Sequence, residues 1–443
     1  MKSLKQTHVI ASFLIVMCSL LTPMSLQAKT DQEVFKEIKF LAERGDPEAQ
    51  FRLAQLYEKG LGVTQDYKAA VKWYRKSAEH GDAGAQYYLA DMYYQGTGVL
   101  KDYKEAVKWY RKSAEKGDAR AQYYLADMYT KGRGVNQDHK KAVKWSRKSA
   151  EQGIAEAQDF LAGMYAHGYG VTQDYAEAVR WYRKAAQQGV ARAQHNLASM
   201  YSQGLGVTQD YKEAAKWYRK AAEQGIAEAQ SNLALLYRHG KGVTQVYKEA
   251  VKWYRKSAEQ GFAEAQFSLA VMYKNASGVT QDYKEAVKWY RKSAEKGHAK
   301  AQFFLAYMYY QGTGVLKDYK EAVKWFRKSA EKGIAEAQFF LATMYDQGKG
   351  VTQDYKEAVK WYRKAAQQGH ARAQFRLAVK YYLGEGVLKN EITSHAWALI
   401  ATMNGHKKAK EIIDFQEKNM RRSDRLAAQQ EAKQILEEIE RKK

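Results

Sequence analysis

Cysteine is almost absent from this chain, since only Cys18 among its 443 residues carries a thiol. A chain cut after Ala28 would have no cysteine at all. It could form no disulfide, and it would offer no thiolate nucleophile and no cysteine-based metal site. Met17 stands before Cys18, where a lipoprotein signal requires a small residue, so we do not expect lipidation. The mature fold must therefore be held together by packing alone.

Proline is nearly as scarce, with only Pro23 and Pro47 in the whole chain. Alanine, lysine, glutamate and glutamine are plentiful, and tyrosine is very abundant. Four of these residue types are good helix formers, and the sequence supplies few signals of strands or irregular loops. The composition therefore predicts an all-α protein.

Long apolar runs are lacking except near the start of the chain. Lys2 and Lys5 precede an apolar stretch from Val9 to Leu21, and a Leu-Gln-Ala sequence ends at Ala28. The stretch is short for a membrane span, which needs roughly 20 apolar residues. This layout is typical of a secretory signal peptide, with a retained membrane anchor as the alternative. We expect residues 1–28 to be removed on export, which leaves a periplasmic or secreted protein with no transmembrane segment.

Acidic residues are under-represented: 73 lysines and arginines face 49 aspartates and glutamates, for a net charge of +24. The signal peptide carries two lysines and no acid, so its removal would leave +22. Such a protein is attracted to anionic surfaces, including acidic sugars and phosphate-bearing lipids. Nucleic acid would fit the charge, but export argues against it as a partner.

What the sequence does have is a repeat of 36 residues without insertion or deletion. Glycines recur at Gly45, Gly81, Gly117, Gly153, Gly189, Gly225, Gly261, Gly297, Gly333, Gly369 and Gly405. All ten tryptophans keep the same step: Trp73, Trp109, Trp145, Trp181, Trp217, Trp253, Trp289, Trp325, Trp361 and Trp397. A period of this length predicts a solenoid of stacked helical units.

Each unit is predicted to be a helix hairpin, as residues 117–153 illustrate. Asp118 precedes a first helix, helix A, in which Leu125 and Met128 belong to one apolar stripe. The Gly-Arg-Gly-Val sequence at 132–135 ends it, because glycine adopts the left-handed conformation that terminates helices. Asp138 is placed to cap the second helix, helix B.

The unit resembles the Sel1-like repeat family, a relative of the tetratricopeptide repeat. The matching pattern is Ala121-Gln122-x-x-Leu125-Ala126-x-Met128-Tyr129, then Gly132-x-Gly134-Val135, Ala142-x-x-Trp145 and Ala150-x-x-Gly153. The resemblance implies a right-handed α-solenoid of helix-turn-helix repeats that acts as an interaction scaffold. Three units depart from the pattern: Ala276 replaces the first turn glycine, Ser146 replaces an aromatic residue, and Lys380 replaces methionine.

The predicted domain order follows from this register. A signal peptide covers 1–28, a capping helix 29–44, ten repeats 45–404, and a degenerate repeat with a charged C-terminal helix 405–443. Solenoid ends need polar caps to stay soluble. The C-terminal helix could instead be a helix that binds a partner.

Function should lie where the copies differ, because invariant positions report packing. Three helix-A positions vary between units, and we call them the first row (equivalent to Tyr123), the second row (Asp127) and the third row (Thr130). In related solenoids helix A lines the concave side, and exposed aromatic side chains are efficient binding anchors. The alternative is that several of these aromatic residues simply pack on the next helix. The predicted partner-binding residues are Tyr87, Tyr94, Tyr123, Phe267, Phe303, Tyr307, Tyr310 and Phe339.

Helix B predicts a second surface. Lys104, Lys108, Arg111 and Lys112 fall opposite its apolar face and form a basic stripe on the convex side, repeated along the array. Such a stripe is either a solvated face or a dock for an anionic polymer or membrane. Trp109 lies at the edge of the apolar face, where we expect it to wedge between units and its N–H to find a partner.

Catalytic motifs are not convincing. Ser113-Ala-Glu-Lys116 fits the S-x-x-K motif of β-lactamases, but it recurs at Ser293 and Ser329, which favours a surface helix pattern. A cysteine-rich branch that resembles this family has β-lactamase activity attributed to it, and this mature chain lacks the cysteines. We therefore predict no enzyme, no cofactor and no metal site. The expected function is an exported scaffold for a protein or peptide partner in the cell envelope; the alternative is a binder of anionic glycan or lipid headgroups.

Overall fold

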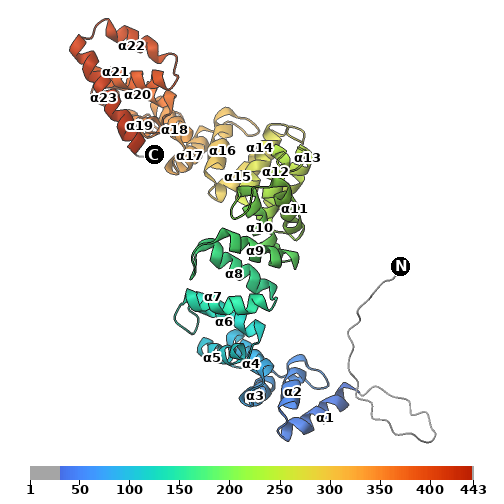
Figure 1. The fold of residues 1–443 in the computed structure, drawn as a ribbon. Helices are drawn as coiled ribbons and strands as arrows, with labels where there is room; N and C mark the ends of the chain where they lie inside the picture. The colour runs from blue at the N-terminus through green and yellow to red at the C-terminus, as the bar shows by residue number, and fades with distance from the viewer. Residues whose placement is uncertain (1–29, 442–443) are drawn as a thin grey trace, which may run out of the picture. The chain divides into compact units, whose positions relative to one another are not determined.

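A computed structural model describes residues 30–441, and the predicted signal peptide with Cys18 lies outside this range. The described residues form 23 α-helices and no strand (Figure 1). The helices are α1 (Asp31–Glu43), α2 (Pro47–Lys59), α3 (Tyr67–Glu79), α4 (Ala83–Gln95), α5 (Tyr103–Glu115), α6 (Ala119–Lys131), α7 (His139–Glu151), α8 (Ala155–His167), α9 (Tyr175–Gln187), α10 (Ala191–Gln203), α11 (Tyr211–Glu223), α12 (Ala227–His239), α13 (Tyr247–Glu259), α14 (Ala263–Lys274), α15 (Tyr283–Glu295), α16 (Ala299–Gln311), α17 (Tyr319–Glu331), α18 (Ala335–Gln347), α19 (Tyr355–Gln367), α20 (Ala371–Leu383), α21 (Glu391–Met403), α22 (Ala409–Glu417) and α23 (Arg422–Arg441). No helix within 30–441 is both long and apolar enough to span a bilayer.

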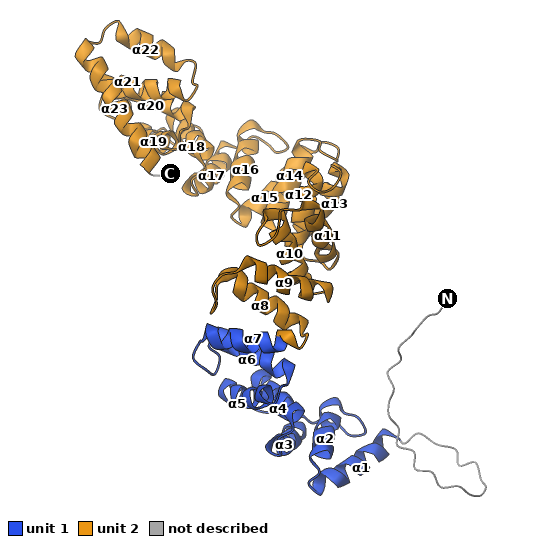
Figure 2. Cartoon of the chain, in the orientation of Figure 1, with its two compact units in different colours: residues 1–149 blue, residues 150–443 orange. Residues whose placement is uncertain are grey.

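The chain divides into two compact units, with the boundary between Ser149 and Ala150 (Figure 2). In both units helix A packs against the helix B that follows it, as α4 does with α5 and α16 with α17. Helix B then packs against the next helix A, so that the hairpins stack. The predicted α-solenoid of helix-turn-helix repeats is confirmed.

The predicted helix ends are also confirmed. At the start of α6, Asp118 accepts a hydrogen bond from the Ala121 backbone N–H at 2.8 Å, which satisfies a donor that the helix leaves unpaired. Gly132 ends α6 with a φ of 64°, in the left-handed region. Asp138 accepts from the Lys141 N–H at 2.9 Å and so caps the following helix B.

The second glycine of the turn has a different purpose from the first. Gly134 also has a positive φ, of 70°, but its α-carbon lies against the first residue of α5 in the preceding repeat. A Cβ there would lie 2.9 Å from the Lys104 backbone nitrogen and still closer to the Tyr103 carbonyl group. This glycine therefore seats each turn on the repeat before it. In the one turn where Ala276 takes the first position, that residue keeps a φ of 55°.

Hydrogen bonds between the two helices of a repeat explain several buried serines. Ser113 is fully buried and donates to the Ala83 carbonyl oxygen at 2.7 Å, and Ser293 and Ser329 make the equivalent bond. The S-x-x-K serines are thus packing residues, and our interpretation of a surface helix pattern was wrong for them. Their hydroxyl groups link helix B to the start of helix A in the same repeat.

On most helices B the tryptophan is buried, and the ammonium group of the lysine three residues later lies over its ring. The Lys112 ammonium lies 4.3 Å from the centre of a Trp109 ring. The expected hydrogen bond of the indole N–H is present at Trp325, which donates to Glu321 at 3.2 Å. The buried Trp109 N–H has no partner among the described residues, so the expectation was wrong at that position.

The ends of the array are covered by additional helices. In unit 1, α1 packs on α2. In unit 2, α23 packs along α21 and buries Ala428, Ala432 and Ile439. Leu426 on α23 stays more than half exposed. The C-terminal helix therefore covers the last hairpin in the way that a solenoid cap does.

Candidate partner-binding face

The eight predicted binding residues all lie on helices A: α4, α6, α14, α16 and α18. Six of them are partly exposed, whereas the Tyr87 and Phe339 residues are only 8% and 5% exposed. Our expectation of exposed anchors was wrong for these two. The Arg120 guanidinium lies 4.3 Å from the Tyr87 ring, and Arg372 lies 4.3 Å from Phe339. In each case a cation at the start of the next helix A covers the ring, so sequence position alone could not reveal the burial.

A row of aromatic side chains escaped the sequence analysis, one residue after the first row. Tyr124 stacks on Tyr110 of helix B with ring centres 5.4 Å apart, and Phe340 stacks on Phe326 at 5.2 Å. Tyr88 and Phe304 stack in the same way on helix B. The available signal was that this position, like the first row, is aromatic towards both ends of the array. Each stack therefore packs an aromatic side chain of helix A, next to the first row, against the preceding helix B.

Three predicted residues meet in unit 2 and form what we call the aromatic cluster: Phe303, Tyr307 and Tyr310, together with Phe340. The Tyr307 ring lies 6.2 Å from Phe303, 6.4 Å from Tyr310 and 5.5 Å from Phe340. All four side chains are partly exposed. Rigid rings that already touch one another lose little conformational entropy when a partner covers them.

A pocket of about 310 Å³, the central pocket, opens on the same rows earlier in unit 2. Ser202 belongs to the third row and Leu235 to the second. The pocket is lined by Ser202, Tyr211, Tyr218, Asn232, Leu235, Leu236, His239 and Lys241. The Lys241 ammonium lies 5.1 Å from the Tyr211 ring. The pocket therefore combines aromatic walls with a lysine and a histidine.

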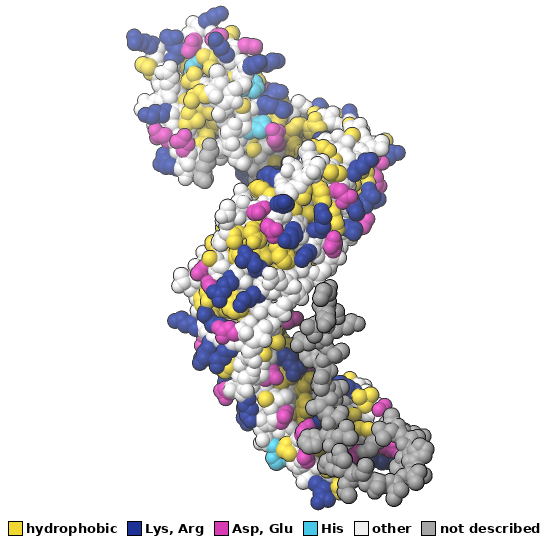
Figure 3. Space-filling model, turned by 45° about the vertical axis from the view of Figure 1, so that its right-hand side comes forward, with side chains coloured by type: hydrophobic (Ala, Val, Ile, Leu, Met, Phe, Trp, Pro, Cys, Tyr) yellow, Lys and Arg dark blue, Asp and Glu magenta, His cyan; other side chains and the backbone are white. Residues whose placement is uncertain are grey.

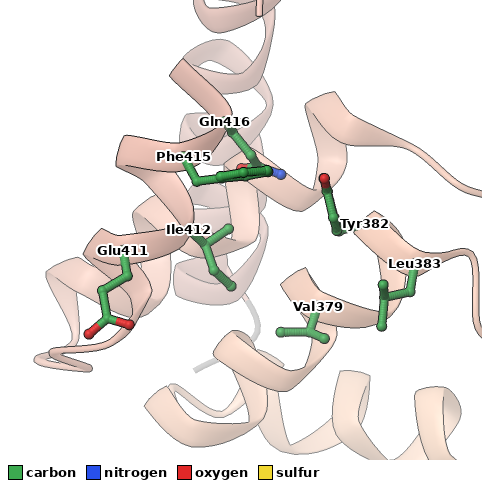
Figure 4. A pocket seen from close by; sticks show the side chains of 7 residues that line it. All are labelled: Val379, Tyr382, Leu383, Glu411, Ile412, Phe415 and Gln416. Carbon is green, nitrogen blue, oxygen red and sulfur yellow. The ribbon is translucent and has the colours of Figure 1, made fainter. Parts of the chain in front are cut away.

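A second pocket, of about 300 Å³, lies between α20 and α22, at the C-terminal end of the second and third rows (Figure 4). Val379 of the second row and Tyr382 of the third row line one side. Ile412 and Phe415 of α22 line the opposite side. Leu383 completes the apolar lining and is 55% exposed. We call this the terminal pocket; its chemistry is that of a receptor for an apolar side chain.

The first row turns polar in the middle of the repeat array, in the repeats that begin unit 2. Asp159 is buried and accepts a hydrogen bond from Arg192 Nε at 2.6 Å, yet burial raises the pKa of its carboxyl above the ordinary value. His195 follows in the next repeat and lies 3.3 Å from the Asn232 side-chain amide. Burial lowers the pKa of His195, because the uncharged ring is favoured away from water. The polar middle thus holds buried titratable groups.

The comparisons with known proteins agree with this repeat architecture. A family model of the Sel1 repeat matches ten consecutive segments that run from 47–82 to 371–406. The chain belongs to the Sel1 repeat family. Proteins of this family generally mediate protein–protein interactions, and their scaffold is typically non-catalytic.

Two solved Sel1 repeat structures are similar over most of their length. One is c5321, described as a protective antigen present in uropathogenic Escherichia coli strains and displaying an SLR fold. It is 37% identical, with a TM-score of 0.63, covering 91% of this chain and 94% of that one. A Sel1 repeat protein from Oxalobacter formigenes is 35% identical, with a TM-score of 0.56, covering 70% and 90% respectively. No curated protein matches the chain.

The predicted basic stripe is exposed on helix B, but its charges have partners within the Sel1 repeats. Lys108 lies 3.1 Å from Glu105, a pair that α15, α17 and α19 repeat. Arg111 donates to the Tyr129 hydroxyl of the next repeat at 3.1 Å, and Lys112 covers Trp109. Lys104 is exposed as well. Arg111 therefore links two repeats, whereas Lys108 and Lys112 have partners within their own helix.

Among residues 30–441 no group of three or more histidine, cysteine, aspartate or glutamate side chains could hold a metal ion. The face instead offers shape, aromatic rings and a few polar groups. This arrangement suits the binding of another molecule.

Proposed function

We propose that this Sel1 repeat protein is an exported scaffold whose helix-A face in unit 2 binds an extended segment of a partner protein. The observation that carries the proposal is that the central pocket, the aromatic cluster and the terminal pocket all lie on the second and third rows. These are the rows that vary most between otherwise similar repeats. Variation on one face of a regular scaffold is what selective binding requires.

The chemistry of the three places suggests what the partner segment contains. An apolar side chain would fill the terminal pocket, and fully burying a leucine-sized group contributes roughly 1.5–3 kcal/mol. The aromatic cluster would pack against a flat or apolar stretch. In the central pocket, Lys241 and His239 favour a polar or acidic group beside an apolar one. We infer a segment with an acidic residue and a distant apolar anchor.

Export is part of the proposal. The first 28 residues have the layout of a signal peptide, and the remaining chain has no cysteine that an oxidising compartment could modify. The similar c5321 is described as a protective antigen, which is consistent with a protein that leaves the cytoplasm. We place the protein in the periplasm or outside the cell, bound to a partner of the bacterial envelope.

The test is affinity capture from an envelope extract with residues 29–443, which contain the whole described fold, at low and high salt. We expect one protein to be retained at high salt and to be lost after Tyr307→Ala with Tyr310→Ala. A second variant, Leu383→Lys, should weaken capture by charging the terminal pocket.

The matched control is Tyr247→Ala, which removes a partly exposed tyrosine at the start of a helix B. Capture that both face variants leave unchanged would refute the binding face. Retention at low salt only, of many acidic species or of cell-wall polymer, would favour the alternative of an anionic ligand bound by helix B.

A further inference from the structure

Three turns between helix A and helix B carry a leucine that the fold does not bury. Leu100, Leu316 and Leu388 are 90%, 89% and 90% exposed. The other seven turns have threonine or asparagine at the same position, such as Thr352. Leu100 lies in unit 1, and the other two lie in unit 2. Single exposed apolar residues are common on proteins, so the context of these three decides their meaning.

The leucines occur in a fixed combination. Each is followed by lysine, at Lys101, Lys317 and Lys389, where the other turns have glutamine. The third row holds tyrosine in the same three repeats, at Tyr94, Tyr310 and Tyr382, and in none of the other seven. We call these three turns the Leu-Lys turns.

Internal packing accounts for the tyrosine and the lysine. In an ordinary turn, Gln353 donates to the carbonyl oxygen of the third-row residue Asp346 at 2.8 Å. In the Leu-Lys turn of α16, the Tyr310 ring instead lies 5.6 Å from Tyr319, and the Lys317 ammonium lies 6.0 Å from Tyr319. A ring and a cation have replaced the glutamine bond. The neighbouring leucine is close to fully exposed, so no internal contact explains it.

We propose that the Leu-Lys turns attach the protein to a lipid bilayer with anionic headgroups. The leucine side chains would enter the boundary between headgroups and acyl chains, and the adjacent lysines would stay at the level of the phosphates. An exposed leucine directly beside a lysine suits this environment. It suits a protein partner less well, because lysine is depleted from protein interfaces and leucine is uncommon among their energetic centres.

The charge of the molecule supports the same ligand. The net charge is +24, and lysines and arginines are spread over the face shown in Figure 3, with apolar side chains between them. An anionic leaflet attracts such a protein over about a Debye length and brings the turns to the surface.

Repetition strengthens the contact within unit 2. Leu316 and Leu388 occupy the same position in the repeat and are separated by the single ordinary turn of Thr352. Two leucine anchors on one stack of repeats bind a bilayer more tightly than either anchor alone. Once the first leucine has inserted, the second is already held close to the bilayer. Leu100 supplies a separate anchor in unit 1.

The experiment is co-sedimentation of residues 29–443 with vesicles of phosphatidylglycerol and phosphatidylethanolamine, and with neutral phosphatidylcholine vesicles. The test variant is L100T/L316T/L388T, which introduces the residue common in the other turns. We expect wild type to bind the anionic vesicles at about 0.15 M salt, and the variant to bind at least about tenfold less tightly. Thr352→Leu should tighten binding by adding an anchor. Leu426→Thr, which removes an exposed leucine from α23, is the matched control and should change nothing.

Three results would overturn the proposal. Equal binding of wild type and the triple variant would mean general electrostatic attraction, and absence of binding at low salt would mean no bilayer contact. Loss of a captured protein by the triple variant, with vesicle binding intact, would make the turns a protein-docking site. Tyr307→Ala alone, which leaves the Leu-Lys turns intact, should leave vesicle binding unchanged, so the proposed partner-binding face and the Leu-Lys turns can fail independently.

Discussion

The two glycines of each turn should respond very differently to the same substitution, and the turn of Gly132 and Gly134 shows why. Both residues have a positive φ, so alanine costs about 1–2 kcal/mol at either position for the left-handed conformation alone. At Gly132 the added Cβ would meet Gln137 at 3.5 Å, an ordinary contact distance. At Gly134 it would meet the backbone of Tyr103 and Lys104, which must move.

We therefore expect Gly132→Ala to destabilise by about 1–2 kcal/mol and Gly134→Ala by about 2–5 kcal/mol, since overpacking adds roughly 1–3 kcal/mol. Urea denaturation followed by circular dichroism measures the difference. Hydrogen exchange should locate the extra loss at the start of α5, one repeat before the substitution. Equal losses for the two variants, or a larger loss for Gly132→Ala, would refute the reasoning that the second glycine seats the turn on its neighbour.

Three further substitutions exploit positions where one repeat differs from the rest. Ala276→Gly should raise stability by about 1 kcal/mol in urea denaturation, because it relieves the positive φ of 55°; lower stability would contradict this. Lys380→Met should cost about 3 kcal/mol, because Lys380 is buried and pairs with Asp346 and Glu385, and adding Asp346→Tyr should recover part of the loss in a double-mutant cycle. The lowered pKa of His195 means that the unfolded chain takes up the proton first, so stability should fall as the pH drops below about 6.5. His195→Phe should flatten that dependence between about pH 7.5 and 5.5, and an unchanged slope would exclude His195 as its source.

The family and the hairpin architecture could be predicted because every local signal recurs ten times. Asp118 and Gly132 act through their own backbone neighbours, so their effect can be inferred from adjacent letters. The helix-A rows were found in the same way, since a difference between otherwise similar copies is visible in one chain. Both pockets of unit 2 do contain residues of the second and third rows.

The sequence by itself thus determined the repeat, its helices and the helix-A rows whose residues differ from one repeat to the next. Only the tertiary structure decided which side chains of these rows stay exposed to a binding partner. Arg120 covers Tyr87 from the next repeat, and α22 closes the terminal pocket from beyond the last full repeat. Burial depends on neighbours that stacking brings together across 30 or more residues, and a pattern within one repeat does not contain that information.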